Sequence, residues 1–92
     1  MNGPPDTIAG VQMHIAHGQV AGHQGTRFAG INCAPAVGGT VAQVRIAIRH
    51  GTGELTADLR EGDTLHLPGQ TWRLDAIHAT RSRWHAILTR IT

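Results

Sequence analysis

Histidines dominate the residues of this chain that could do chemistry. Seven occur among 92 residues, namely His14, His17, His23, His50, His66, His78 and His85. Imidazole changes charge near neutral pH and is the commonest metal ligand, so it can transfer protons or hold a metal. The chain has no His-x-x-x-His pair and only one cysteine, Cys33, so a metal site would have to be assembled from separate strands. The sequence therefore predicts neither a metal site nor a cofactor.

Three polar side chains stand where an alternating apolar pattern would place an inward-facing residue. They are His17, His78 and Arg90, which continue the apolar faces of segments 11–15, 72–76 and 84–88. Each lies at the end of a predicted strand. Either the strand ends simply face water, or these side chains line a polar pocket at the mouth of the fold, where binding sites are common.

In the pocket hypothesis, His17 and His78 are the candidate catalytic residues. The candidate binding residues are Arg90 and the two tryptophans, with Trp72 or Trp84 as an apolar wall. A neutral histidine there could shuttle protons for an isomerisation or a cyclisation that needs no cofactor.

The segments that position these side chains alternate with the period of two that is typical of β-strands. No segment has a convincing helical stripe. Seven strands are predicted, at residues 11–17, 26–33, 41–49, 54–60, 64–67, 71–78 and 84–91. Short connections favour an antiparallel meander. We therefore predict an all-β fold, a small antiparallel barrel or sandwich of about seven short strands.

The most patterned stretch, EGDTLHLPGQTWRLDAI at residues 61–77, predicts a tight hairpin. Gly62 supplies the unusual φ of a turn, and the side chain of Asp63 can accept hydrogen bonds from nearby backbone N–H groups. Pro68 and Gly69 form the next turn. Trp72 then anchors the hairpin, because its large ring buries much surface in a core with few aromatic residues.

The domain organisation is simple. Residues 1–9 have little periodicity and are predicted to be a flexible N-terminal tail, followed by a single β domain at residues 10–92. The chain has no signal-peptide pattern and no apolar run near the ~20 residues that cross a membrane. A cytoplasmic protein without membrane association is expected.

The charge distribution argues against nucleic acid as a partner. The net charge is only +2, and the arginines are scattered along the chain instead of forming a run or stripe. The expected partners are a small-molecule or peptide ligand, or another protein. The outward face of residues 41–49, or an edge strand, could also pair two copies into a homodimer.

The pattern REGDTLHLPGQTWRLDAI at residues 60–77 is followed by an alternating strand with WHAIL at residues 84–88. Together they resemble a family of short uncharacterised actinobacterial all-β proteins with the motif R-x-G-D-x-(F/L)-x-(V/L)-x-G-x-T-W-R. The matching residues are Arg60, Gly62, Asp63, Thr64, Leu65, Leu67, Gly69, Thr71, Trp72 and Arg73. The resemblance covers roughly the C-terminal half and implies an all-β fold, without an activity that could be transferred.

Two functions follow from these observations. The first is a small non-catalytic β domain that binds a ligand or partner protein, as an accessory of a bacterial biosynthetic pathway. The alternative is a small cofactor-independent cyclase or isomerase that uses a histidine at the barrel mouth for acid–base chemistry. A pocket with convergent polar groups would favour the enzyme, and a flat apolar patch would favour partner binding.

Overall fold

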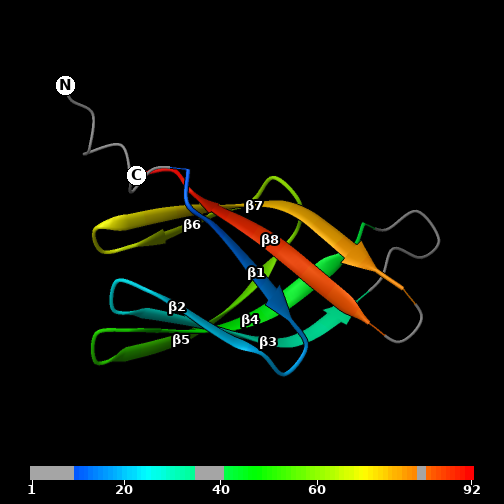
Figure 1. Cartoon of the computed structure of the whole chain (residues 1–92), viewed down its shortest axis with the longest axis horizontal. Helices are drawn as coiled ribbons and strands as arrows, with labels where there is room; N and C mark the ends of the chain where they lie inside the picture. The colour runs from blue at the N-terminus through cyan, green and yellow to red at the C-terminus, as the bar shows by residue number, and fades with distance from the viewer. Residues whose placement is uncertain (1–9, 35–40, 81–82) are drawn as a thin grey trace.

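Alternating side chains along the chain build two antiparallel sheets that face each other (Figure 1). The computed structural model describes residues 10–34, 41–80 and 83–92, so the predicted tail at residues 1–9 lies outside the described residues. Those parts contain eight strands and no helix. The strands are β1 (Gln12–Ala16), β2 (Val20–His23), β3 (Thr26–Ala34), β4 (Gln43–His50), β5 (Gly53–Leu59), β6 (Thr64–Leu67), β7 (Gln70–Ala79) and β8 (Trp84–Arg90). The all-β prediction is confirmed.

The strand order explains how the sheets form. One sheet has the order β1-β8-β7-β6 and the other β2-β3-β4-β5. The predicted meander holds within β2–β5 and within β6–β8, whereas β1 crosses to pair with β8, as the blue and red strands of Figure 1 show. A parallel bridge between His17 and Gly30 links the sheets at one corner. The sheets are not closed into a barrel, so the fold is a sandwich.

The inward faces of both sheets form one apolar core. The alternation places Ile15, Ile46 and Leu88 at 0% exposure, as expected for strands with one buried face. Trp72 lies in this core, and its ring packs edge-to-face on Phe28 with centroids 5.2 Å apart. The predicted turn at residues 61–63 is also present, and the Asp63 side chain accepts a hydrogen bond from the Arg60 N–H at 2.9 Å.

The strand that is not among the seven predicted ones is β2, which lies between the predicted strands 11–17 and 26–33. β2 and β3 are joined by the two-residue turn Gln24-Gly25, and both residues have positive φ, 47° and 81°. This is the pattern of a type I′ hairpin, which an Asn-Gly or Asp-Gly pair usually signals in a sequence. Because glutamine occupies the first turn position, the sequence does not signal this hairpin.

A bulge in β7 changes which side chains face the core after Asp75. Leu74 pairs with Leu88 and Ala76 with Ile87, so Asp75 is an extra residue on β7. Because side chains alternate between faces, one extra residue moves the following ones to the opposite face. The expected inward orientation of His78 is therefore wrong, and this imidazole lies on the outer face, opposite His85.

The carboxylate of Asp75 contacts one side chain of β7 and one of β8. Its carboxylate accepts hydrogen bonds from Arg73 Nε at 2.6 Å and from the hydroxyl of Thr89. These contacts, the one from Arg73 first, lower the pKa of Asp75 below its ordinary value. A carboxylate of this kind stabilises the fold above its unfolded pKa of about 3.9 and loses that contribution as the pH falls through its folded pKa.

We expect Asp75→Asn to lower the free energy of unfolding by about 1 kcal/mol near neutral pH, since the Asp75–Arg73 pair is partly exposed. The difference from the native protein should shrink as the pH falls below about 4, because the native carboxylate then becomes protonated. Urea unfolding followed by circular dichroism across this range measures both curves. A difference that stays constant down to the lowest pH would show that the Asp75 charge is not involved.

Candidate functional site

The predicted site residues gather in part at one corner of the sandwich, where β1 and β7 end and β8 begins. A cavity of about 520 Å³ lies there. Its lining includes His17, Gln19, His78, Arg83, Trp84 and His85. The corner thus brings together both candidate catalytic histidines and one of the two candidate binding tryptophans.

Backbone contacts with Gly30 hold one wall of this cavity. The Gly18 N–H donates to the Gly30 carbonyl at 3.0 Å, and the Gly30 N–H donates to the Gln19 carbonyl at 3.1 Å. These bonds fix the chain on both sides of Gly18. Glycine is required because a Cβ at position 30 would lie 2.3 Å from the carbonyl oxygen of Ala16 and 2.9 Å from the ring of Trp84.

Histidines from three strands form a row beside the cavity. The His85 ring is nearly parallel to that of His78, with centroids 4.8 Å apart, and to that of His14 at 6.1 Å. His78 and His85 are direct cross-strand partners. Sequence reasoning did not select His14 and His85, because this arrangement depends on the register of β7 and β1 against β8.

The electrostatic character of the corner follows from its side chains. Among the lining residues that the structure describes there are three imidazoles and the guanidinium of Arg83, and there is no carboxylate. Trp84 is half-buried and adds a flat apolar surface, with the His17 ring edge-on to it at 6.4 Å. Such a lining suits a ligand with a negative charge beside an apolar ring.

The remaining predicted site residues lie elsewhere. Trp72 has 0% exposure, so it cannot form the wall of a pocket. Arg90 faces inward as expected but is only 5% exposed. Its guanidinium donates to Gln24 Oε1 at 2.8 Å, to the Gly69 carbonyl at 3.1 Å and to the Thr92 carbonyl at 2.8 Å. Arg90 therefore links the hairpin turns at Gln24 and Gly69 to the residues that follow β8. This cluster lies away from the histidine corner.

In the described part of the chain, Cys33 and the other potential metal ligands form no metal site. Within residues 10–34, 41–80 and 83–92, no three His, Cys, Asp or Glu side chains are arranged to hold a metal ion. Partial burial raises the pKa of the Cys33 thiol, so the thiol stays protonated near neutral pH and is a poor nucleophile.

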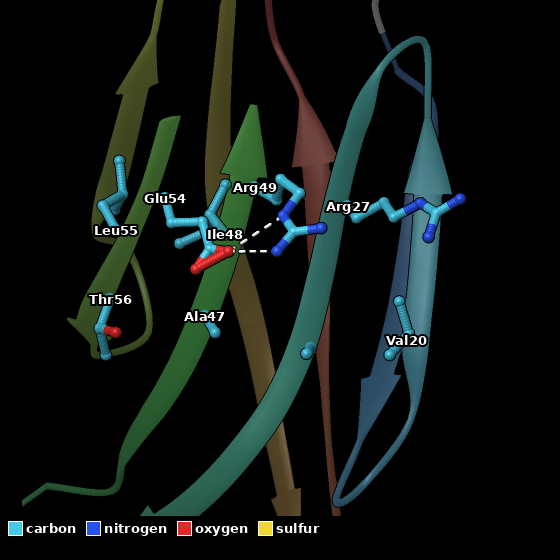
Figure 2. A pocket seen from close by; sticks show the side chains of 9 residues that line it. Val20, Arg27, Ala47, Ile48, Arg49, Glu54, Leu55 and Thr56 are labelled. Carbon is cyan, nitrogen blue, oxygen red and sulfur yellow. Dashed lines mark hydrogen bonds and ion pairs between the residues drawn. The ribbon is translucent and has the colours of Figure 1, made fainter. Parts of the chain in front are cut away.

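A second hollow, of about 380 Å³, lies over the sheet β2-β3-β4-β5 (Figure 2). The register aligns a row of small side chains across all four strands: Val20, Ala29, Ala47 and Thr56. Figure 2 shows the ion pair between Arg49 and Glu54 to one side of this row. The pair Arg45–Asp58, with Nε and Oδ1 2.8 Å apart, borders its other side, and the hydrogen bond from Arg45 lowers the pKa of Asp58.

Comparison with known proteins gives one match. A family model described as "Family of unknown function (DUF6406)" matches residues 8–92. No curated protein and no solved structure shows significant similarity to the chain. Within its described part, the structure has no helix long and apolar enough to cross a membrane.

Proposed function

Because the chain belongs to DUF6406, a family of unknown function, we propose its function from the geometry of the histidine corner. The protein is a non-catalytic β domain that binds a small ligand carrying an anionic group next to a flat apolar ring. The observation that carries the proposal is the lining of the corner cavity, in which three imidazoles and Arg83 meet Trp84 without a carboxylate among the described residues. We place this binding in the cytoplasm, supported by a chain with one cysteine.

Each part of the ligand has a matching part of the site. The anionic group accepts hydrogen bonds from Arg83 and from the imidazoles of His78 and His85. The apolar ring lies against Trp84. Stacking on an indole contributes about 1 kcal/mol beyond the area that it buries.

Binding is favoured over the isomerase or cyclase alternative because the described residues give the corner histidines no orienting partner. Within those residues, the side-chain hydrogen bond to a histidine ring is that between His50 and Thr26, and none involves the imidazole of His17, His78 or His85. A histidine that acts as a general base is normally held in place by a further group, often a carboxylate.

We expect indole-3-acetate to bind at this corner with a Kd in the millimolar range, about what so small a ligand gains from a partly open site. Titration into ¹⁵N-labelled protein should shift the backbone signals of His17, Trp84 and His85. The neutral indole-3-acetamide should bind more weakly than indole-3-acetate, because it lacks the negative charge that Arg83 and the imidazoles receive.

Histidine variants provide the matched controls. His78→Gln and His85→Gln should each weaken binding of indole-3-acetate, whereas His66→Gln, an exposed histidine on β6, should leave it unchanged. If the acetamide bound as well as the acetate, or if the shifts mapped outside the corner, the proposed function would be wrong.

A further inference from the structure

β5 is a long edge strand, and its outer side is accessible for pairing with another strand. It ends the order β2-β3-β4-β5, and no described strand pairs with its outer side. It has seven residues, whereas the edge strands β2 and β6 have four each and β1 has five. Proteins usually protect such edges with proline, charged side chains, a bulge or a short length. β5 has no proline, and its pairing with β4 runs without a register shift.

The hairpin geometry shows which backbone groups of β5 point outward. β4 and β5 are joined by the two-residue turn Gly51-Thr52, with Gly51 at φ 60° and His50 opposite Gly53. The pair that closes such a turn is hydrogen-bonded, and hydrogen-bonded pairs then alternate along an antiparallel ladder. The N–H and C=O groups of Glu54, Thr56 and Asp58 therefore point away from β4.

The side chains of β5 leave this edge accessible. Glu54 and Asp58 lie on the outer face and are paired with Arg49 and Arg45 of β4, so their charges are turned away from the edge. Figure 2 shows Glu54 directed towards Arg49. Leu55 lies on the inward side, opposite the buried Ile48, yet is 43% exposed. An edge with unpaired backbone groups and an exposed leucine favours pairing with another strand.

We propose that β5 pairs antiparallel with β5 of a second copy across a two-fold axis, so that two four-stranded sheets become one sheet of eight strands. The occupant is a second copy because the strand is complementary to itself in one register. Three registers, centred on Leu55, Thr56 or Ala57, keep the inner and outer faces of both copies aligned.

The charges and apolar side chains select among these registers. Centring on Thr56 places Glu54 opposite Asp58 of the partner subunit, and like charges directly opposite are destabilising. Centring on Ala57 places Leu55 opposite Leu59 of the partner subunit, and Leu59 is only 6% exposed, so the exposed leucine gains little apolar contact there. Centring on Leu55 places Glu54 opposite Thr56 of the partner subunit and brings the two exposed leucines together. We therefore assign the Leu55-centred register. Because so few residues pair, the dimer is weak, with a Kd on the order of 100 µM, as in small transient interfaces.

Proline at position 56 tests the pairing. Thr56 is exposed and its N–H points outward, so Thr56→Pro removes an edge donor without removing a bond to β4. Sedimentation velocity from about 10 µM to about 1 mM, a range that brackets the expected Kd, should show the native protein and Thr56→Ala forming dimers as concentration rises. Thr56→Pro should stay monomeric, and circular dichroism checks that it is folded. A native protein that is monomeric throughout, with or without a bound extended peptide, would overturn the proposal.

Disulfide crosslinking tests the register independently of proline. In a Cys33→Ala background, Leu55→Cys places two thiols across the two-fold axis in a non-hydrogen-bonded pair, where cross-strand Cβ atoms are close. Mild oxidation should give a covalent dimer for Leu55→Cys and none for the matched Ala57→Cys variant, whose position lies opposite Gly53 of the partner subunit. Crosslinking of Ala57→Cys alone, or dimers of Thr56→Pro as tight as the native ones, would show that the copies associate elsewhere.

Discussion

Trp72→Ala should remove a large part of the free energy that stabilises the fold. Trp72 is fully buried, packs on Phe28 and His23, and donates from Nε1 to Gln70 Oε1 at 2.9 Å. Removing a buried tryptophan side chain costs about 3–5 kcal/mol. Gln70 is only 6% exposed, so losing its donor adds about 1 kcal/mol or more. The total stability of a 92-residue domain is roughly 5–14 kcal/mol, so this single change removes a large part of it.

Urea unfolding followed by circular dichroism measures this loss, with Trp84 as a fluorescent reporter. Trp72→Phe keeps an aromatic ring and should lose clearly less stability than Trp72→Ala. The matched control is Trp84→Ala, because Trp84 is only half-buried. If Trp84→Ala were as destabilising as Trp72→Ala, Trp72 would not be the centre of the core.

Gly30→Ala should cost about 3 kcal/mol, the upper part of the range for overpacked sites. The new Cβ would be 2.3 Å from the Ala16 carbonyl oxygen, a distance at which the backbone must move. That oxygen is held in place because it accepts a hydrogen bond from the Gln19 N–H at 3.0 Å. The Cβ would also push against the Trp84 ring, so the corner cavity should change shape and lose affinity for indole-3-acetate.

Gly22→Ala is the matched control for this prediction. A Cβ at Gly22 would have its nearest neighbour at 3.5 Å, an ordinary van der Waals contact, and Gly22 is on β2 of the same sheet. We expect a change within about 0.5 kcal/mol, as for most exposed positions. Equal unfolding midpoints for the two variants would show that the close approach at Gly30 is not essential.

The parts of the fold that could be predicted from the sequence are those that depend on local alternation. Each of the seven predicted strands has a counterpart, and segment 41–49 alternates as expected, with Val44, Ile46 and Ile48 buried. The hairpin of β2 with β3 was missed because Gln24 takes a conformation that glycine or asparagine usually signals. Local pattern also cannot show that β1 pairs with β8, since that contact joins distant segments.

The candidate site was only partly predictable, for a related reason. His17 and Trp84 do lie at one corner, but Arg90 lies with Gln24 and Gly69 instead. His78 reaches the corner on the outer face because of the bulge at Asp75. A bulge is defined by how two strands pair, and the sequence of one strand does not reveal it.

The pairing of β1 with β8 sets an order for folding. Strands β2 to β5 are consecutive hairpins, which need to close only short loops, whereas residues 12–16 pair with residues 85–89 at the far end of the described chain. Contacts so distant in sequence form late, because the intervening chain must lose entropy first. During synthesis β1 stays without its partner until β8 has left the ribosome. The histidine corner, which needs β1, β7 and β8 together, is therefore completed in the last step of folding.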